Sequence, residues 1–527
     1  MKPAPSPVAA LAEGAHRFDD LGGYHMKVTA TPEAQAWFDQ GLRLNYGFNH
    51  DEATRSFARG AEVDPGCAMC FWGAALTMGP NYNVPMLPDR AQAAWGALQR
   101  AKALADKTTP LEQALIGALA VRYKGPEPLD PPSMQPLNVA YADAMRSVAK
   151  KFPESEDAQV LFAEAMMDTN PWHLWGLDGK PAAGTDEIIA ALEGVLAKDP
   201  SHPGANHYYI HAVEASPHPE KALAAAERLP GLEPGAGHIV HMPAHIFQRV
   251  GRYADASAAN EHAIKVDDAY FAAVKPPGYY PMYLGHNWGF LAFSDSMRGR
   301  GASSLAAARA VLKAVPPEMI DMMPGMDFFF AEPILVMVRF GRWDELLAEP
   351  RPAAKYIVLT GLWLHGHGMA LASKGRLKDA LADHDELVKL AAAAPPDLQG
   401  GNNVARDLLG VAAKILQARI ATLQKKKAAL ALWAEAVALE DKLAYSEPSD
   451  WFYPVRHYQG AALLAAHRAK EAEAVYREDL RRNPGNGWAL FGLAQALKAQ
   501  KKDAAAVESD LAKVWDGADV KLTASAF

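Results

Sequence analysis

Six side chains of types that bind metal ions recur at helical spacing near the middle of the sequence. They lie in residues 205–222, ANHYYIHAVEASPHPEKA, and in residues 235–256, GAGHIVHMPAHIFQRVGRYADA. The six are His207, His211, Glu214, His238, His241 and His245. Imidazole binds zinc, copper, iron and nickel, and a mixed His/carboxylate set with an open position suits an oxygen-activating iron or a hydrolytic zinc. The cluster predicts a transition-metal site, provided that the elements carrying it bring its members together.

A metal-free binding groove would use the same residue types. A single histidine on a helix is more often a hydrogen-bonded polar residue than a ligand, and histidines in a groove can bind a carboxylate or a phosphate. Histidines four residues apart lie one turn apart on the same face of a helix. Choosing between the two hypotheses therefore requires knowing which helix faces carry these residues.

A repeating pattern of helix pairs runs along the chain. In residues 34–65, the bulky Trp37 and Phe57 take positions 4 and 24 counted from Ala34, and the small Gly41 and Ala53 take positions 8 and 20. Small residues let two antiparallel helices approach, bulky ones fill the space between them, and the proline at position 32 ends the second helix. The pattern resembles the tetratricopeptide repeat (TPR), a helix–turn–helix unit of about 34 residues.

The same register recurs later in the chain. Gly460, Ala472, Tyr476 and Pro484 again take positions 8, 20, 24 and 32. Turns of the same kind are expected at residues 251–256, 341–346 and 375–380, and weaker copies at 68–105, 156–200, 285–318 and 487–515. Loop insertions rich in proline and glycine interrupt the array at 170–185, 275–283 and 391–403.

These observations predict an all-α fold, a TPR-type helical solenoid of antiparallel helix pairs with loop insertions. We expect an N-terminal extension over residues 1–30 and a single solenoid over 31–527, with a metal or ligand groove centred on 156–300. Segments such as HYYIHAVEAS and HMPAHIFQRVGRY also resemble long bacterial TPR-containing proteins without a settled activity. That resemblance implies the fold and no particular reaction, because one fold supports many functions.

The TPR resemblance implies that positions 2, 5, 9, 12 and 13 of each first helix line a concave surface. In this register His207, His211 and Glu214 take positions 5, 9 and 12. The second segment places His238, His241 and His245 at positions 2, 5 and 9. Helices in contact lie about 8–10 Å apart, so imidazoles from two successive first helices can meet over one ion.

The predicted metal ligands are His207, His211, His241 and His245, with Glu214, His238, His286 and Glu164 as further ligands or as residues that orient them. This set is large enough for one iron, copper or zinc ion or for a dinuclear site. Residues predicted to contact a substrate or to line the groove are Arg249, Gln248, Trp172, Tyr208, His365 and His457. No catalytic residue is assigned. The aromatic insertion that carries Trp172 is either ordinary packing or a lid over the site.

Pro243 falls inside one of the predicted first helices, where it removes the hydrogen bond to the Ile239 carbonyl. Either the helix kinks there, or it begins at the proline and leaves His238 and His241 on a preceding bend. Pro333 takes the same position in a later repeat.

The first functional hypothesis is a metalloenzyme that acts on a small molecule. Oxidative chemistry at iron or copper comes first, and a zinc-dependent hydrolase is an alternative. The alternative from another class is a TPR scaffold that binds a peptide or a partner protein without catalysis. The sequence has no glycine-rich phosphate loop, no G-x-S-x-G and no H-E-x-x-H, so motif support for nucleotide-dependent and common hydrolytic chemistry is missing.

Composition narrows the remaining classes. The 527 residues include 50% hydrophobic and 22% charged residues, which is typical of a globular protein. A net charge of −8 argues against nucleic acid as a partner. No apolar run approaches the roughly 20 residues of a membrane helix, and the N-terminus does not resemble a signal peptide, so a cytoplasmic protein is expected. Cys67 and Cys70 are too few for a disulfide framework, and we expect buried structural thiols there.

Overall fold

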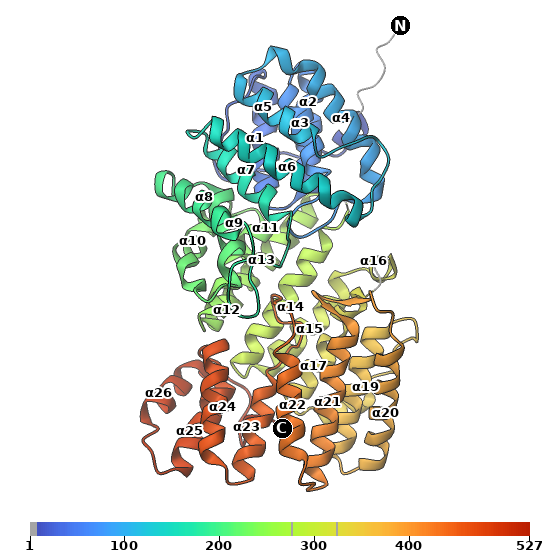
Figure 1. The fold of residues 1–527 in the computed structure, drawn as a ribbon, viewed down its shortest axis with the longest axis vertical. Coiled ribbons are helices and arrows are strands. Elements are labelled where there is room, and N and C mark those ends of the chain that lie inside the picture. Colours follow the sequence, from blue (N-terminus) through green and yellow to red (C-terminus); the bar gives the residue numbers. More distant parts are fainter. Residues whose placement is uncertain (1–7, 276–277, 323–324) are drawn as a thin grey trace. The chain divides into compact units, whose positions relative to one another are not determined.

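The computed structural model describes residues 8–275, 278–322 and 325–527. Helices account for nearly all of its regular structure (Figure 1). In the described residues one small sheet pairs β1 (Gln399–Gly400) with β2 (Asn403–Val404) in antiparallel register. The predicted all-α class is therefore confirmed. Residues 1–7 of the expected N-terminal extension and residues 276–277 of the expected insertion at 275–283 lie outside the described residues.

Contacts divide the chain into two compact units, which are described separately. Unit 1 comprises residues 1–246 and 262–283, and unit 2 comprises residues 247–261 and 284–527. The expected single solenoid over residues 31–527 stays a prediction.

The helices of the first part of the chain are α1 (Pro32–Tyr46), α2 (His50–Val63), α3 (Ala68–Thr77), α4 (Ala91–Leu104), α5 (Pro110–Ala120), α6 (Pro131–Lys151), α7 (Glu156–Met167), α8 (Thr185–Lys198), α9 (Pro203–Glu214), α10 (Leu223–Arg228), α11 (Gly237–His241), α12 (Pro243–Arg249) and α13 (Tyr253–Ala273). Those of the second part are α14 (Pro281–Met297), α15 (Gly301–Ala314), α16 (Pro317–Met322), α17 (Glu332–Arg339), α18 (Trp343–Ala348), α19 (Ile357–Ser373), α20 (Leu377–Ala393), α21 (Ala405–Leu423), α22 (Ala429–Glu440), α23 (Val455–Ala465), α24 (Ala469–Arg482), α25 (Gly487–Ala499) and α26 (Ala505–Val514). Short 3₁₀ helices are η1 (Ala9–Ala12), η2 (Pro88–Arg90), η3 (Ala105–Lys107), η4 (Pro219–Ala222), η5 (Leu229–Gly231) and η6 (Met326–Ala331).

The packing of the first helices follows the TPR pattern. Gly41 on α1 and Gly73 on α3 both face the ring of Phe57 on α2, so that a methyl group on either glycine would lie within 2.7 Å of that ring. The two glycines are one repeat apart, and each takes position 8 of its helix pair. The absence of a side chain at position 8 thus lets the large residue at position 24 pack between successive first helices.

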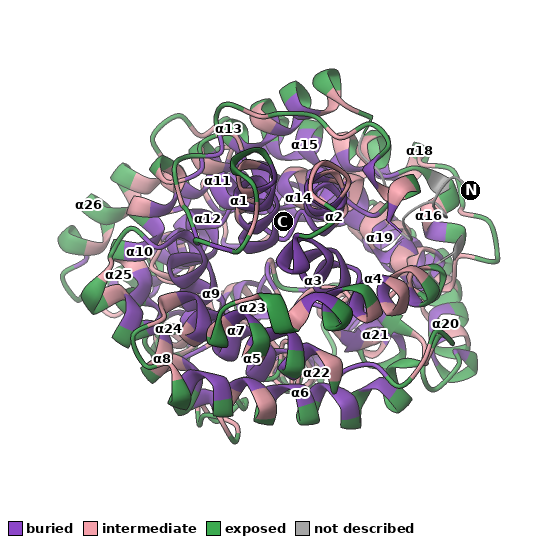
Figure 2. Ribbon diagram, turned by 90° about the horizontal axis from the view of Figure 1, so that it is seen from above, coloured by how far each residue is buried: buried purple, intermediate pink, exposed green. Residues whose placement is uncertain are grey.

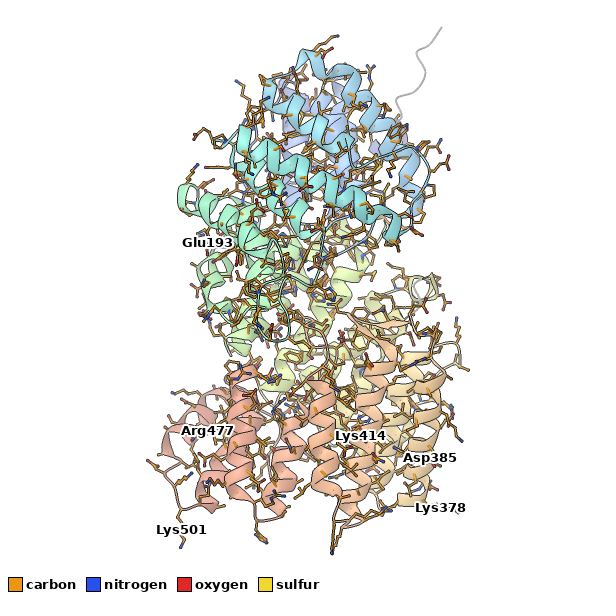
Figure 3. The ribbon with its side chains drawn as sticks, viewed as in Figure 1. Glu193, Lys378, Asp385, Lys414, Arg477 and Lys501 are labelled. Atoms are coloured by element: carbon orange, nitrogen blue, oxygen red, sulfur yellow. A yellow bond between two sulfur atoms is a disulfide. The ribbon has the colours of Figure 1, made fainter. Side chains whose placement is uncertain are left out.

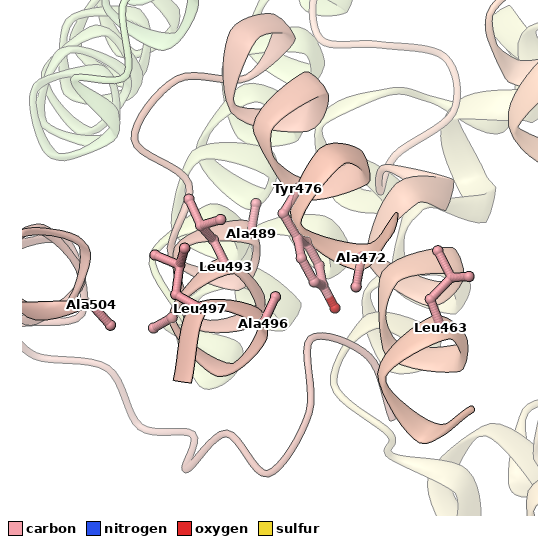
Figure 4. Packing of buried hydrophobic residues seen from close by; sticks show 9 residues of the cluster. Leu463, Ala472, Tyr476, Ala489, Leu493, Ala496, Leu497 and Ala504 are labelled. Atoms are coloured by element: carbon pink, nitrogen blue, oxygen red, sulfur yellow. The ribbon is translucent and has the colours of Figure 1, made fainter. Parts of the chain in front are cut away.

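Unit 2 repeats this arrangement near its C-terminus. Gly460 on α23 and Gly492 on α25 both face the ring of Tyr476 on α24. Figure 4 shows Tyr476 among the buried side chains of Ala472, Leu493 and Ala496. Both repeats whose positions were numbered from the sequence therefore pack as predicted, and the fold is of TPR type.

Burial differs between the first and second helices of a pair. Every residue of α3 and of α9 is buried, whereas α6 and α8 carry exposed residues on one side (Figure 2). Charged residues such as Lys378 and Asp385 on α20, and Lys501 after α25, are exposed and lie at the edge of the view (Figure 3). The first helix of each of these pairs is therefore the more buried one, and its side chains can form a site in the interior.

Helices that lie far apart in the sequence pack against each other in unit 1. The C-terminal end of α1 contacts α9, which lies about 160 residues further along the chain. Gly204 at the start of α9 faces the ring of Tyr46, so that a methyl group there would lie 2.5 Å from it. The Tyr46 hydroxyl also donates a hydrogen bond to Asp157 of α7 at 2.7 Å. The inner face of α9 is therefore covered by the first repeat.

The structure shows whether the helices kink at Pro243 and Pro333 or begin there. Pro243 is the first residue of α12, and the preceding short helix α11 ends at His241. Pro333 is the second residue of α17. Proline is tolerated in the first turn of a helix because no hydrogen bond is lost there. The second alternative is confirmed, and His238 and His241 lie ahead of the helix that carries His245.

Cys67 and Cys70 form a disulfide at the start of α3. The prediction of structural thiols is therefore wrong, although both residues are fully buried as expected. The reason is the spacing. The two cysteines are three positions apart at the start of a helix, which brings their sulfur atoms within bonding distance. Within the described residues no helix is both long and apolar enough to cross a membrane.

Candidate metal centre

Helix α9 presents three of the six clustered residues on one face. It begins at Pro203 and is capped by His202, whose Nδ1 accepts a hydrogen bond from the Ala205 amide at 3.2 Å. Spacings of four and three residues then place His207, His211 and Glu214 on one stripe. None of the three is more than 1% exposed. The stripe is thus interior rather than part of an open groove.

The other three residues come from α11 and α12. His238 and His241 lie on α11, and His245 lies on the first turns of α12. They are 2%, 0% and 1% exposed. The ring centroid of His238 lies 5.0 Å from that of His207, and the centroid of His245 lies 5.5 Å from that of His211. All six residues belong to unit 1 and are gathered in one place, as the sequence predicts.

Three imidazoles have the arrangement that a metal ion requires. One ring nitrogen from each of His207, His211 and His238 lies within 4.8 Å of the others. Among the described residues, His207 Nε2, His211 Nε2 and both ring nitrogens of His238 have no hydrogen-bond partner. Each of these atoms is buried, and a buried polar atom without a partner is costly.

The remaining nitrogens of two of these rings are held in place. His207 Nδ1 donates to the carbonyl oxygen of Tyr46 at 2.5 Å, and His211 Nδ1 donates to Oε1 of Glu214 at 2.8 Å. Since a carbonyl or carboxylate oxygen only accepts, both protons are on Nδ1 and both Nε2 atoms carry a lone pair. This tautomer and orientation are those of metal-binding histidines.

Glu214 connects the two halves of the cluster. Its Oε2 accepts a hydrogen bond from Nδ1 of His245 at 2.5 Å, while Oε1 accepts the one from His211. Nε2 of His245 in turn lies 2.8 Å from Nε2 of His241. Burial alone would raise the pKa of Glu214, but the two neighbouring histidines lower it below its usual value. The carboxylate therefore stays ionised and accepts from both rings.

The imidazoles are available in their neutral form. Burial lowers the pKa of His207 and His238 well below the usual value, and the adjacent imidazoles lower it further. Burial also lowers the pKa of His211, and the charge of Glu214 offsets part of that effect. Metal binding requires the deprotonated ring nitrogen, so burial favours the ligand form.

A second group of possible ligands shares one member with the first. Atoms of His211, Glu214 and His245 also lie within 4.8 Å of one another. In that group, however, the close atoms already form hydrogen bonds to each other. Binding an ion there would break both bonds, whereas the set of His207, His211 and His238 keeps them. The three-imidazole set is therefore the better site.

Aromatic rings surround the three imidazoles. Phe48, in the connection after α1, packs on His207 with centroids 4.6 Å apart and stacks on His211 and His238 at 5.8 Å each. Tyr283 lies 4.6 Å from His238. Neither Phe48 nor Tyr46 is identifiable from the sequence, because nothing in the repeat register says which distant turn closes over α9.

The insertion at 170–185 also reaches the cluster. The ring of Trp172 lies 5.8 Å from His211 and stacks on Tyr82 at 5.3 Å, and Tyr82 lies 5.2 Å from His211. Trp172 thus lies beside His211, and the choice between ordinary packing and a lid stays a prediction. The chain departs from ordinary backbone geometry here, since Trp172 has φ 63°.

Glu164 and Tyr208 belong to a neighbouring polar group. Both are buried, and in the described part of the chain Glu164 Oε2 and the Tyr208 hydroxyl have no hydrogen-bond partner. Burial, and then the charge of Asp168, raises the pKa of Glu164 well above its usual value. Asp168 itself pairs with the buried Arg122. Glu164 is in none of the three-residue groups around His211 that the described residues form.

The other predicted residues lie in unit 2. Gln248 is buried, and the Arg249 guanidinium lies 5.4 Å from the Tyr445 ring. His286 is half-buried, with its ring 5.5 Å from Phe290. His365 and His457 are fully buried.

Both buried histidines of unit 2 have partners at each ring nitrogen. His365 contacts the Ala412 carbonyl at 2.9 Å and the Tyr453 hydroxyl at 2.6 Å. His457 contacts Arg339 at 2.7 Å and Asp479 at 2.8 Å. We assign none of the unit 2 residues to the three-imidazole set.

No protein-family profile matches the chain, and no curated protein matches it either. Among solved structures the chain is similar to the human IFIT1 dimer with m7Gppp-AAAA, at 13% identity over 86% of this chain and 90% of that chain, with a TM-score of 0.36. It is similar to yeast Tom70 at 10% identity over 89% of each chain, with a TM-score of 0.29. A structure of Naa15/Naa10 bound to HypK-THB matches at 15% identity over 92% of this chain and 70% of that chain, with a TM-score of 0.23.

Proposed function

We propose that unit 1 binds a transition-metal ion through Nε2 of His207, Nε2 of His211 and one ring nitrogen of His238. The observation that carries this proposal is that these three buried imidazoles converge with their lone-pair nitrogens unpartnered. A buried polar group without a partner costs about 1–3 kcal/mol. An ion at the centre of the three would satisfy one nitrogen of each ring, and among the described residues the second nitrogen of His238 would keep no partner.

The surroundings of the ligands support the same proposal. Metal-binding histidines almost always donate their second N–H to a carbonyl or carboxylate, and His207 and His211 do so. A structural zinc site usually has four protein ligands, whereas a catalytic one has three and an open position. The three-imidazole set therefore supports a metalloenzyme acting on a small molecule.

The metal decides the reaction. Three neutral imidazoles suit copper, iron and zinc. Oxidative chemistry at iron or copper remains our first hypothesis, and hydrolysis at zinc is the second. If a second ion binds, His241 and His245 are the residues that would hold it, and the ion would replace the hydrogen bond that joins their Nε2 atoms at 2.8 Å.

Metal analysis of protein purified without a histidine tag tests the proposal. We expect one equivalent of a transition metal, or two if the second pair is also occupied. His238→Ala should remove one equivalent while the helical circular dichroism stays at the wild-type level. His218→Ala is the matched control, because His218 lies in the same unit with its side chain 67% exposed. Absence of metal, together with no binding on addition of copper, iron or zinc, would exclude the metal centre.

A scaffold that binds a peptide or partner protein is the second candidate function. Unit 1 contains a cavity of about 940 Å³ between residues 23–27 and residues 151–157. Its lining carries charges of both signs, including Lys27, Lys151, Glu154 and Glu156, and none of the six clustered residues lines it. A TPR scaffold would use such a surface without a metal, so a metal-free protein that binds a partner there favours this candidate.

A further inference from the structure

Four consecutive helix pairs of unit 2 share one turn geometry. The pairs are α19–α20, α21–α22, α23–α24 and α25–α26. After the first helix of each pair one residue is left-handed, with φ between 54° and 80°: Gly375, Lys425, His467 and Lys501. The amide of the next residue donates to the carbonyl five positions earlier at 2.9 Å in all four turns. This bond is that of the Schellman motif, so the four turns present their side chains in equivalent directions.

The four turns lie along one edge of unit 2. Successive pairs pack side by side, since α19 contacts α21, α22 contacts α23, and α23 contacts α25. The two helices of a pair are antiparallel, so the turns that join them are all at the same end of the stack. Figure 3 shows Lys378 and Lys501, from the first and last of these pairs, along the lower edge of the view. We call residues 374–379, 424–428, 467–473 and 498–503 the basic edge.

The charge of the basic edge is opposite to that of the rest of the chain. The edge contains eleven lysines and arginines and four carboxylates, a net charge of +7. The whole chain has a net charge of −8. A charge asymmetry of this size is typical of a protein that contacts a negatively charged partner on one side.

The arginines of the basic edge are neutralised locally. Arg376 pairs with Asp379, and Arg468 pairs with Glu471, in each case across one turn of the following helix. Three of the lysines also pair with carboxylates. The remaining six are exposed and form no ion pair with any residue that the structure describes: Lys378, Lys425, Lys426, Lys427, Lys470 and Lys501. The available positive charge is therefore carried by ammonium groups on flexible stems.

The residue types favour a lipid surface over a nucleic acid. Arginine is the usual residue for recognising nucleic-acid phosphates, and the arginines here are already paired. None of the four turns contains a Phe, Trp or Tyr on which an unpaired base could stack. Leu381 and Leu423, in contrast, are 39% and 38% exposed and lie within three positions of a free lysine. Exposed aliphatic side chains beside lysines suit the headgroup region of a bilayer.

We propose that the basic edge of unit 2 docks on the surface of a membrane that contains anionic lipids. The contact is peripheral, through the ammonium groups of the six free lysines, and does not depend on the metal centre. Clusters of about 4–8 basic residues bind anionic headgroups, and each lysine near the surface strengthens binding about fivefold.

Co-sedimentation of the full chain with lipid vesicles tests the inference. Vesicles of phosphatidylcholine with phosphatidylglycerol supply the anionic surface, and vesicles of phosphatidylcholine alone are neutral. We expect saturable binding to the anionic vesicles only. Binding should be lost when salt shortens the Debye length from about 10 Å to about 3 Å, because the contact is electrostatic.

Two variants with the same loss of charge locate the contact. Replacement of Lys425, Lys426 and Lys427 together by glutamine should weaken binding to the anionic vesicles about 100-fold. The matched control replaces Lys102, Lys107 and Lys124 of unit 1, which are also exposed, and should keep the wild-type affinity. Circular dichroism checks that both variants are folded. Lys378→Gln with Lys501→Gln serves as a second variant of the edge, with an expected weakening of about 25-fold.

Three results would overturn the inference. The first is absence of binding to anionic vesicles, and the second is equal binding to neutral ones. The third is equal weakening in the edge variants and in the control, which would mean that overall charge and not the basic edge is responsible. Tighter binding to a DNA or RNA duplex than to the vesicles, with the same dependence on Lys425, Lys426 and Lys427, would identify a nucleic acid as the partner instead of a membrane.

Discussion

Glu214 holds His211 in the one tautomer that leaves Nε2 available. The hydrogen bond from His211 Nδ1 to the carboxylate is 2.8 Å long and lies within a single turn of α9. The second oxygen of Glu214 does the same for His245 on α12. One carboxylate therefore orients two imidazoles that come from different helices.

The first prediction concerns Glu214→Leu. Leucine has no acceptor, so His211 and His245 both lose their orienting bond. Loss of such a hydrogen-bond partner typically weakens metal affinity 10–100-fold. Competition with a chelator of known affinity measures the change. Wild-type affinity in the variant would mean that Glu214 has no orienting role.

The second prediction is that metal stabilises unit 1. An ion bound only by the folded state adds about 2.7 kcal/mol when its free concentration is 100 times the Kd. Addition of the native metal should therefore raise the midpoint of thermal unfolding, and a chelator should lower it. His238→Ala should remove the shift and His218→Ala should keep it. A shift of equal size in both variants would point to binding elsewhere.

The third prediction uses the buried His365 of unit 2. Burial lowers its pKa from the usual 6.5 to about 4. Between these values the unfolded chain binds a proton that the folded state does not, so this residue reduces stability as the pH falls from about 6.5 to 4. This loss of stability is at most about 3 kcal/mol, and it is absent at neutral pH.

Chemical denaturation at several pH values checks this contribution. The free energy of unfolding of His365→Gln should fall less steeply below pH 6.5 than that of the wild type. His467→Asn is the control, because His467 is exposed and asparagine tolerates its φ of 57°. Parallel pH curves for wild type and His365→Gln would refute the prediction.

The fourth prediction compares alanine substitutions at two glycines of unit 2. A methyl group on Gly492 would lie 2.2 Å from the ring of Tyr476, so Gly492→Ala should destabilise the protein by about 1–3 kcal/mol. Gly410 on α21 has no side chain or distant backbone atom within 4 Å of the added methyl group. Gly410→Ala should stabilise the protein by about 0.5–1 kcal/mol, as expected in a helix. Denaturant midpoints of the two variants should therefore move in opposite directions.

The fold could be predicted because the repeat register is local. The glycine at position 8 and the large residue at position 24 meet within one or two helix pairs, so Gly41 and Phe57 are recognisable from spacing alone. The stripe on α9 follows from the same periodicity. Each of these features depends on residues fewer than about 40 positions apart.

The rest of the site depends on contacts that spacing does not encode. Tyr46 and Phe48 reach His207 across about 160 residues because the helices of unit 1 close on one another. The register also assigns the same inner face to His365, which the structure surrounds with satisfied partners. Position in the repeat thus identifies the face, while contacts between distant segments of unit 1 decide what covers it.

The placement of Phe48 over the imidazoles has a consequence for exchange kinetics. The ligand nitrogens are buried, so an ion bound among them has no direct route to bulk solvent, and its release requires one of the segments that cover it to open locally. The dissociation rate would then follow the frequency of that opening. A bulky chelator would strip the ion no faster than a small one, because neither could reach it in the closed state.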